Sequence, residues 1–118
     1  MKIDPTTKTV SVHGREALDL PYTRWSNDEE SVQIDISAST MFIEIPGANI
    51  RKQLITNPAD PKGLKIFLTR EEVAHIPIRP TPYVLIDETN EDSPFIEMEA
   101  KIFRTGYTHE PEEQPPLP

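Results

Sequence analysis

Residues 96–102 alternate strictly between apolar and charged side chains, and this alternation constrains the fold more than any other feature of the chain. Successive side chains of a β-strand point to opposite faces, so the pattern predicts a strand that is buried on one side. The apolar set is expected to face a core and the charged set to face water: Ile96, Met98, Ala100 and Ile102 inward, Glu97, Glu99 and Lys101 outward. The β-rich run 83–86 comes before this strand and the acidic stretch 87–94 separates the two, so residues 83–104 are predicted to form a β-hairpin.

Prolines divide the chain into short segments. The sequence has 13 prolines and only 4 glycines, and most of the prolines lie between apolar runs. Proline cannot donate a hydrogen bond to a sheet and is excluded from helix interiors. This distribution favours many short strands over a few long helices.

Other segments between the prolines also have the character of strands. They are residues 9–12, 32–36, 41–45, 50–55 and 64–68. In 32–36 the side chains of Val32, Ile34 and Ile36 alternate with polar ones, which predicts that these three face the core. Together with the hairpin, these segments give about seven strands, a pattern typical of an all-β, Ig-like antiparallel β-sandwich.

One short helix is predicted after residues 64–68. The run Thr69-Arg70-Glu71-Glu72 matches a capping box, in which the threonine and a glutamate three residues later satisfy exposed backbone N–H groups. Beyond the strands, the composition changes, and residues 107–118 are acidic and proline-rich with little to bury. We therefore expect a sandwich domain over residues 1–106 and a C-terminal tail over residues 107–118.

The charge and composition disfavour several classes of function. The formal net charge is −8, and a surface of this sign repels phosphate backbones, so no nucleic-acid partner is expected. The first residues lack the apolar region of a secretory signal, and no apolar run approaches the roughly 20 residues of a membrane span. The chain has no cysteine, which fits assembly in a reducing compartment.

No motif of the sequence identifies catalytic or metal chemistry. His13, His75 and His109 are far apart and lack the spacing of zinc ligands, while the serines have no nucleophile elbow and the glycines form no phosphate loop. The acidic run 87–92 could offer oxygens to calcium, although it lacks the spacing of an EF-hand, and a solvated turn is favoured. We expect no enzymatic activity, no metal and no cofactor.

Four aromatic residues are candidates for a functional surface. Tyr22, Trp25, Phe42 and Phe67 lie in proline-interrupted segments or on the outward positions of strands. They either cover the ragged edges of the sandwich or form an exposed apolar patch, and such patches usually mark contacts with partners. The candidate partner-binding residues are these four and the following residues of the tail: Tyr107, Pro111, Pro115, Pro116 and Leu117.

Three stretches together resemble small β-sandwich proteins of tailed-phage virions. They are residues 64–74, residues 83–87 and residues 94–102, and the earlier stretch 18–25 with Asp28 is similar to the opening segment of those proteins. The resemblance is to the Ig-like domains near the N-termini of baseplate upper proteins and to related neck, tail or fibre-attachment proteins. A glycine often occupies the closing strand of that family, where this chain has Ala100.

The resemblance implies a structural and interaction protein that is assembled into a virion in the host cytoplasm. Its partners would be other virion proteins, and it would be a homo-oligomer or be present in several copies, with no catalytic residues. The acidic tail would then order on a neighbouring subunit. A free carbohydrate- or ligand-binding module that uses Tyr22 and Trp25 as a stacking platform is the alternative, and an inhibitor whose acidic face mimics nucleic acid is a third possibility.

Overall fold

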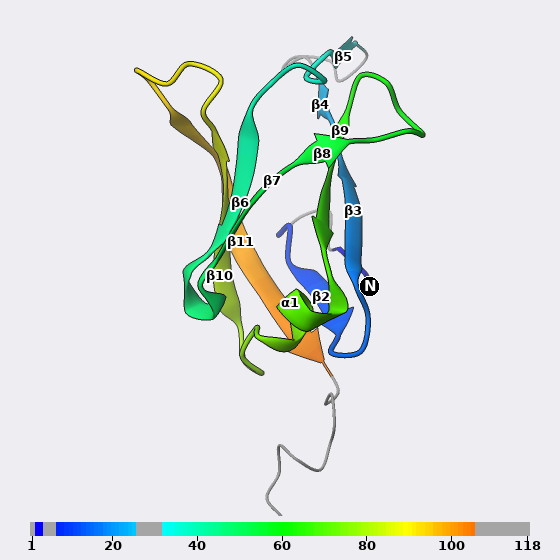
Figure 1. Ribbon diagram of the computed structural model, residues 1–118, viewed down its shortest axis with the longest axis vertical. Helices are drawn as coiled ribbons and strands as arrows, with labels where there is room; N and C mark the ends of the chain where they lie inside the picture. Colours follow the sequence, from blue (N-terminus) through cyan, green and yellow to red (C-terminus); the bar gives the residue numbers. More distant parts are fainter. Residues whose placement is uncertain (1, 4–6, 26–31, 106–118) are drawn as a thin grey trace, which may run out of the picture.

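Two β-sheets packed face to face form the body of the protein. The computed structural model describes residues 2–3, 7–25 and 32–105. The larger sheet has six strands in the order β1 (Lys2–Ile3), β2 (Val10–His13), β11 (Phe95–Thr105), β10 (Thr81–Asp87), β6 (Met41–Ile45) and β7 (Ile50–Gln53). The smaller sheet has three strands in the order β3 (Leu18–Tyr22), β9 (Leu64–Leu68) and β8 (Ile55–Thr56). In Figure 1 the strands β6, β10 and β11 lie to the left of β3 and β9.

The prediction of an all-β sandwich with one short helix is confirmed. In the described part of the chain, the strands of four or more residues are β2, β3, β6, β7, β9, β10 and β11. Two short strands, β4 (Arg24–Trp25) and β5 (Gln33–Ile34), form a separate ribbon at the upper end of Figure 1. The pairing is antiparallel except between β2 and β11, which run parallel.

The inward faces of the strands follow the alternation in the sequence. Met41, Ile43 and Ile45 of β6 are buried, and Leu64, Ile66 and Leu68 of β9 are buried opposite them. The central strand β10 adds Tyr83 and Leu85, and β2 adds Val10 and Val12. Because a fully buried side chain of this size contributes roughly 1.5–3 kcal/mol, this shared core is the main source of stability.

The hairpin of β10 and β11 is confirmed, but the expected orientation of its second strand is wrong at one end. Leu85 pairs with Met98 and Ile86 pairs with Ile96, so Glu97 is an extra residue in a β-bulge. Ile102 is buried, and Met98 and Ala100 pack against the core, as expected. Beyond the bulge, however, Ile96 is 51% exposed, and the Glu97 side chain is only 14% exposed instead of lying in water.

The segment 32–36 also differs from the prediction. Its strand is limited to β5, and only Ile36 is buried, whereas Val32 and Ile34 are 61% and 39% exposed. The ribbon of β4 and β5 belongs to neither sheet, so the apolar positions of β5 do not face an opposing layer. Alternation identifies a strand, but it does not show whether a second sheet covers that strand.

Residues 50–55 form two strands in different sheets. The chain leaves β7 at the buried residue Leu54 and enters β8, so this segment crosses from the larger sheet to the smaller one. The backbone N–H of Leu54 donates to the carbonyl of Met41, with an N···O distance of 2.8 Å. Pro21 lies in the edge strand β3, where its missing N–H is tolerated.

The helix α1 (Arg70–Ala74) begins with the predicted capping box. Thr69 Oγ1 accepts a hydrogen bond from the backbone N–H of Glu72 at 3.2 Å, and Glu72 Oε1 accepts from the N–H of Thr69 at 2.8 Å. Val73, on the inner side of α1, is buried in the core. The cap thus fixes where the chain turns from β9 into the helix.

The substitution Thr69→Ala removes one half of this capping box. We expect it to lower the free energy of unfolding by about 1 kcal/mol, because an N-terminal N–H of the helix loses its acceptor. Urea denaturation measures the change. The matched control is Thr56→Ala on the exposed strand β8, for which we expect less than about 0.5 kcal/mol. Equal losses in the two variants would contradict the role of the cap.

Candidate functional site

The four aromatic residues singled out in the sequence do not form one patch. Phe42 lies on the outer face of the larger sheet, where the guanidinium carbon of Arg51 is 3.7 Å from the centre of its ring. Phe67 is on the outer face of the smaller sheet, on the opposite side of the sandwich. Both rings are partly buried. Tyr22 and Trp25 lie near the upper end, in β3 and β4, so the four residues contribute to separate surfaces.

The predicted stacking platform is not assembled either. Tyr22 packs against the core, and its hydroxyl donates a hydrogen bond of 2.6 Å to Glu97 Oε2. Trp25 is exposed, and its indole N–H donates to Thr23 Oγ1 at 3.0 Å. One ring therefore points into the sandwich while the other lies on the surface. The tail candidates Tyr107, Pro111, Pro115, Pro116 and Leu117 lie outside the described residues, and partner binding by any of the nine residues remains a prediction.

A polar cluster around Arg24 closes the upper end of the sandwich. The Arg24 guanidinium contacts Glu97 through two nitrogens, with Nη2 2.7 Å from Oε1 and Nε 3.2 Å from Oε2. The same Nη2 lies 3.0 Å from Asp87 Oδ2. We call Tyr22, Arg24, Asp87 and Glu97 the Arg24 cluster. It connects β3 and β4 to β10 and β11 of the larger sheet.

Hydrogen bonds and burial set the protonation of this cluster. Burial raises the pKa of the Asp87 carboxyl, but hydrogen bonds from the hydroxyl and N–H of Thr89 and from Arg24 outweigh burial, so its pKa falls below the ordinary value of 3.8. Burial and the hydrogen bond to Glu97 raise the pKa of Tyr22, which keeps its hydroxyl a donor. The Asp87 carboxylate is thus charged at neutral pH, where it pairs with Arg24.

The sequence does not reveal this cluster. Asp87 begins an acidic run that is typical of a solvated turn, yet the residue is buried, so the prediction of a solvated turn is wrong at this position. Glu97 occupies an outward position of the alternating strand, and only the bulge turns it toward Arg24. A bulge of this kind has no signal in the residue pattern. Pairing of Arg24 with distant acidic residues depends on tertiary structure.

Exposed apolar side chains surround the Arg24 cluster. Ile34 lies directly across the ribbon from Arg24, and the guanidinium carbon of Arg24 is 6.0 Å from the centre of the Phe95 ring. Five of the large exposed hydrophobic residues lie in β4, β5 and the start of β11 or directly beside them. We call this set the apolar end: Trp25, Val32, Ile34, Phe95 and Ile96.

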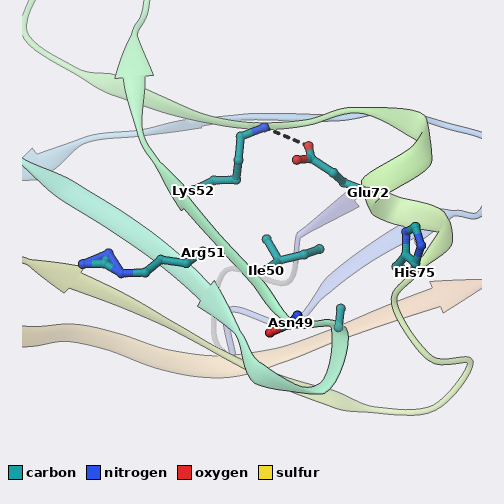
Figure 2. Close-up of a pocket in the computed structure, with 7 residues that line it drawn as sticks. Asn49, Ile50, Arg51, Lys52, Glu72 and His75 are labelled. Carbon is teal, nitrogen blue, oxygen red and sulfur yellow. Dashed lines mark hydrogen bonds and ion pairs between the residues drawn. The ribbon is translucent and has the colours of Figure 1, made fainter.

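A pocket of about 400 Å³ lies beside the free edge of β7 (Figure 2). Ile50 and Lys52 of β7 line it together with Glu72 of α1 and His75 at the end of the helix. Lys52 Nζ is 2.8 Å from Glu72 Oε1, as the dashed line in Figure 2 shows, and His75 Nδ1 is 2.8 Å from the carbonyl of Glu71. The Lys52–Glu72 pair thus connects β7 to α1, whereas the His75 contact lies within the end of the helix. Arg51 also lines the pocket and pairs with Glu44 and Glu88.

The described residues contain no group of three or more histidine, cysteine or acidic side chains arranged to hold a metal ion. Within the same part of the chain, no helix has the length and apolar character needed to cross a membrane. Comparison of the chain with protein-family models and with curated proteins finds no match. The Arg24 cluster and the apolar end are therefore the features on which a functional proposal can rest.

The substitution Asp87→Asn tests the electrostatics of the Arg24 cluster. At pH 7 we expect a loss of about 2 kcal/mol of stability, because a buried charge-assisted hydrogen bond is removed. The folded pKa of Asp87 is below its unfolded value, so the stabilisation is present above pH 3.8 and is lost as the pH falls below this value. The difference between wild type and variant should shrink accordingly in urea titrations from pH 7 to pH 2.

The matched control is Asp92→Asn, in the exposed turn of the same hairpin. This variant should follow the pH dependence of the wild-type protein. A stability difference between wild type and Asp87→Asn that stays constant across this pH range would contradict the assignment.

Proposed function

We propose that the protein is a structural and interaction subunit of a phage virion, acting in the tail, neck, baseplate or fibre attachment. The observation that carries this proposal is the apolar end, a group of large hydrophobic side chains exposed near one partly buried ion-pair cluster. The resemblance of residues 64–74, 83–87 and 94–102 to Ig-like virion domains is the reason for proposing a phage virion as the assembly.

The composition of the apolar end supports binding to another protein. Contiguous exposed apolar surfaces on soluble domains usually mark interaction sites, and the cores of interfaces are rich in aromatic residues and arginine. Here Trp25 and Phe95 supply the rings, and Arg24 precedes Trp25 in β4, with its guanidinium carbon 6.0 Å from the centre of the Phe95 ring.

The Arg24 cluster favours binding because it limits the motion of the surface around it. The two-nitrogen contact with Glu97 and the contact with Asp87 hold the ribbon of β4 and β5 against β10 and β11. A surface that is already ordered loses less conformational entropy on association. The partner in this proposal is a neighbouring virion protein, and the protein is present in several symmetry-related copies.

The test is the double substitution Ile34→Ser with Phe95→Ser. We expect its copy number in gradient-purified particles to fall about tenfold or more, because two anchoring side chains leave the interface. Quantitative mass spectrometry of the particles against the wild-type chain measures the change. Both residues are exposed, so the variant should remain folded, which thermal denaturation checks.

The matched control is Ile78→Ser, which removes an isoleucine of similar exposure between α1 and β10, away from the apolar end. This variant should be incorporated at the wild-type level. Absence of the wild-type chain from purified particles would contradict the virion role. Normal incorporation of the double variant would contradict the role of the apolar end.

A further inference from the structure

The lower end of the sandwich, where the last strand finishes, carries exposed arginines on the β2–β3 turn and on α1. β11 ends at Thr105, whose carbonyl accepts a hydrogen bond from the N–H of Gly14 at 2.9 Å. Gly14 and Arg15 lie in the turn between β2 and β3, next to α1 (Figure 1). A pocket of about 260 Å³ opens between this turn and the helix, and its lining residues are Gly14, Arg15, Arg70, Glu71 and Ala74.

The arginines at this end have no carboxylate partner among the residues that the structure describes. Arg15 and Arg70 are exposed and lack an ion pair within residues 7–25 and 32–105, unlike Arg24 and Arg51. Arg104, the residue before Thr105, is 7% exposed, and its Nη1 has no hydrogen-bond partner among the described residues. Its Nε donates to the carbonyl of Ile76 at 2.7 Å.

The chain itself supplies carboxylates directly after this point. Glu110, Glu112 and Glu113 follow Thr105 at a short distance in the sequence, and four residues, 106–109, separate Thr105 from the first of them. In an extended conformation four residues span about 12 Å, at roughly 3.1 Å per residue. The pocket borders Gly14, which is hydrogen-bonded to Thr105, so its arginines lie near the point where β11 ends.

We propose that the acidic segment 110–113 binds the pocket between the β2–β3 turn and α1 of the same chain. Carboxylates of the segment pair with Arg15 and Arg70. Glu71 lines the same pocket, so the lining residues together carry one net positive charge. The carboxylates of the segment should therefore contact the two arginine side chains and not the side of the pocket that carries Glu71. The site is therefore an intramolecular docking surface for an acidic, proline-containing peptide.

Attachment to the same chain favours this occupant over a second copy. A segment tethered by a few residues has an effective concentration in the millimolar range, which exceeds the protein concentration in most solutions. Proline residues in the segment also reduce the conformational entropy that is lost on docking. The inference concerns the isolated chain and does not depend on the proposed virion role.

Paramagnetic relaxation in the full-length protein tests the proposal. The chain has no cysteine, so Gln114→Cys provides a single site for a nitroxide label next to Glu113. We expect selective broadening of the amide signals of Gly14, Arg15, Arg70 and Ala74 at low salt. The signals of the 57–60 loop at the upper end should be unaffected.

Two charge variants make the test specific. Replacing Glu110, Glu112 and Glu113 by glutamine in the labelled chain should reduce the broadening about fivefold, and Arg15→Gln with Arg70→Gln should reduce it similarly. The matched control, Glu91→Gln with Asp92→Asn, removes two carboxylates from the far hairpin turn and should leave the broadening unchanged.

A mixed sample separates binding within one chain from binding between chains. It combines spin-labelled protein without ¹⁵N and unlabelled protein with ¹⁵N, so only contacts between chains produce broadening. The proposal predicts no broadening in this sample. Broadening in the mixed sample of the strength seen within the labelled chain would overturn it in favour of a second copy. Absence of selective broadening, or broadening that persists in the triple glutamine variant, would also overturn it.

Discussion

The contact between Arg24 and the two carboxylates of Asp87 and Glu97 is the interaction on which the upper end of the structure depends. The larger sheet and the β4–β5 ribbon share no strand pairing, so a side chain must connect them. Arg24 makes this connection with three nitrogen–oxygen contacts of 2.7–3.2 Å. Loss of the guanidinium would leave two carboxylates in a largely buried space, which is more costly than the absence of the whole cluster.

The sandwich has two ends of different chemical character, and each suggests a separate role. At the upper end, Arg24 pairs with Asp87 and Glu97, and the nearby exposed side chains are apolar. At the lower end, the arginines lack carboxylate partners among the described residues and lie where the chain leaves its last strand. We infer that the first end docks on another protein and that the second receives an acidic segment of the same chain. The hydrophobic core, formed by the inward side chains of the strands, lies between these two surfaces.

The sequence predicts those parts of the fold that depend on local pattern. Alternation correctly assigns the buried residues of β6 and β9, and the run Thr69–Glu72 correctly places α1, because strand orientation and helix capping are determined within a few residues. The pattern fails at Ile34 and Glu97, where the outcome depends on which layer covers a strand and on a bulge in the pairing. The candidate surface was predicted only in part: Trp25 belongs to the apolar end, whereas Phe42 and Phe67 lie on opposite outer faces.

A double-mutant cycle between Arg24 and Glu97 tests the central claim most directly. The variants Arg24→Met, Glu97→Gln and their combination are compared with the wild-type protein by urea denaturation at pH 7. Two residues in direct contact within a buried network should show a coupling free energy of about 1–3 kcal/mol. Additive losses, with a coupling near zero, would contradict the account, because they would show that the two strands are held together without this pair.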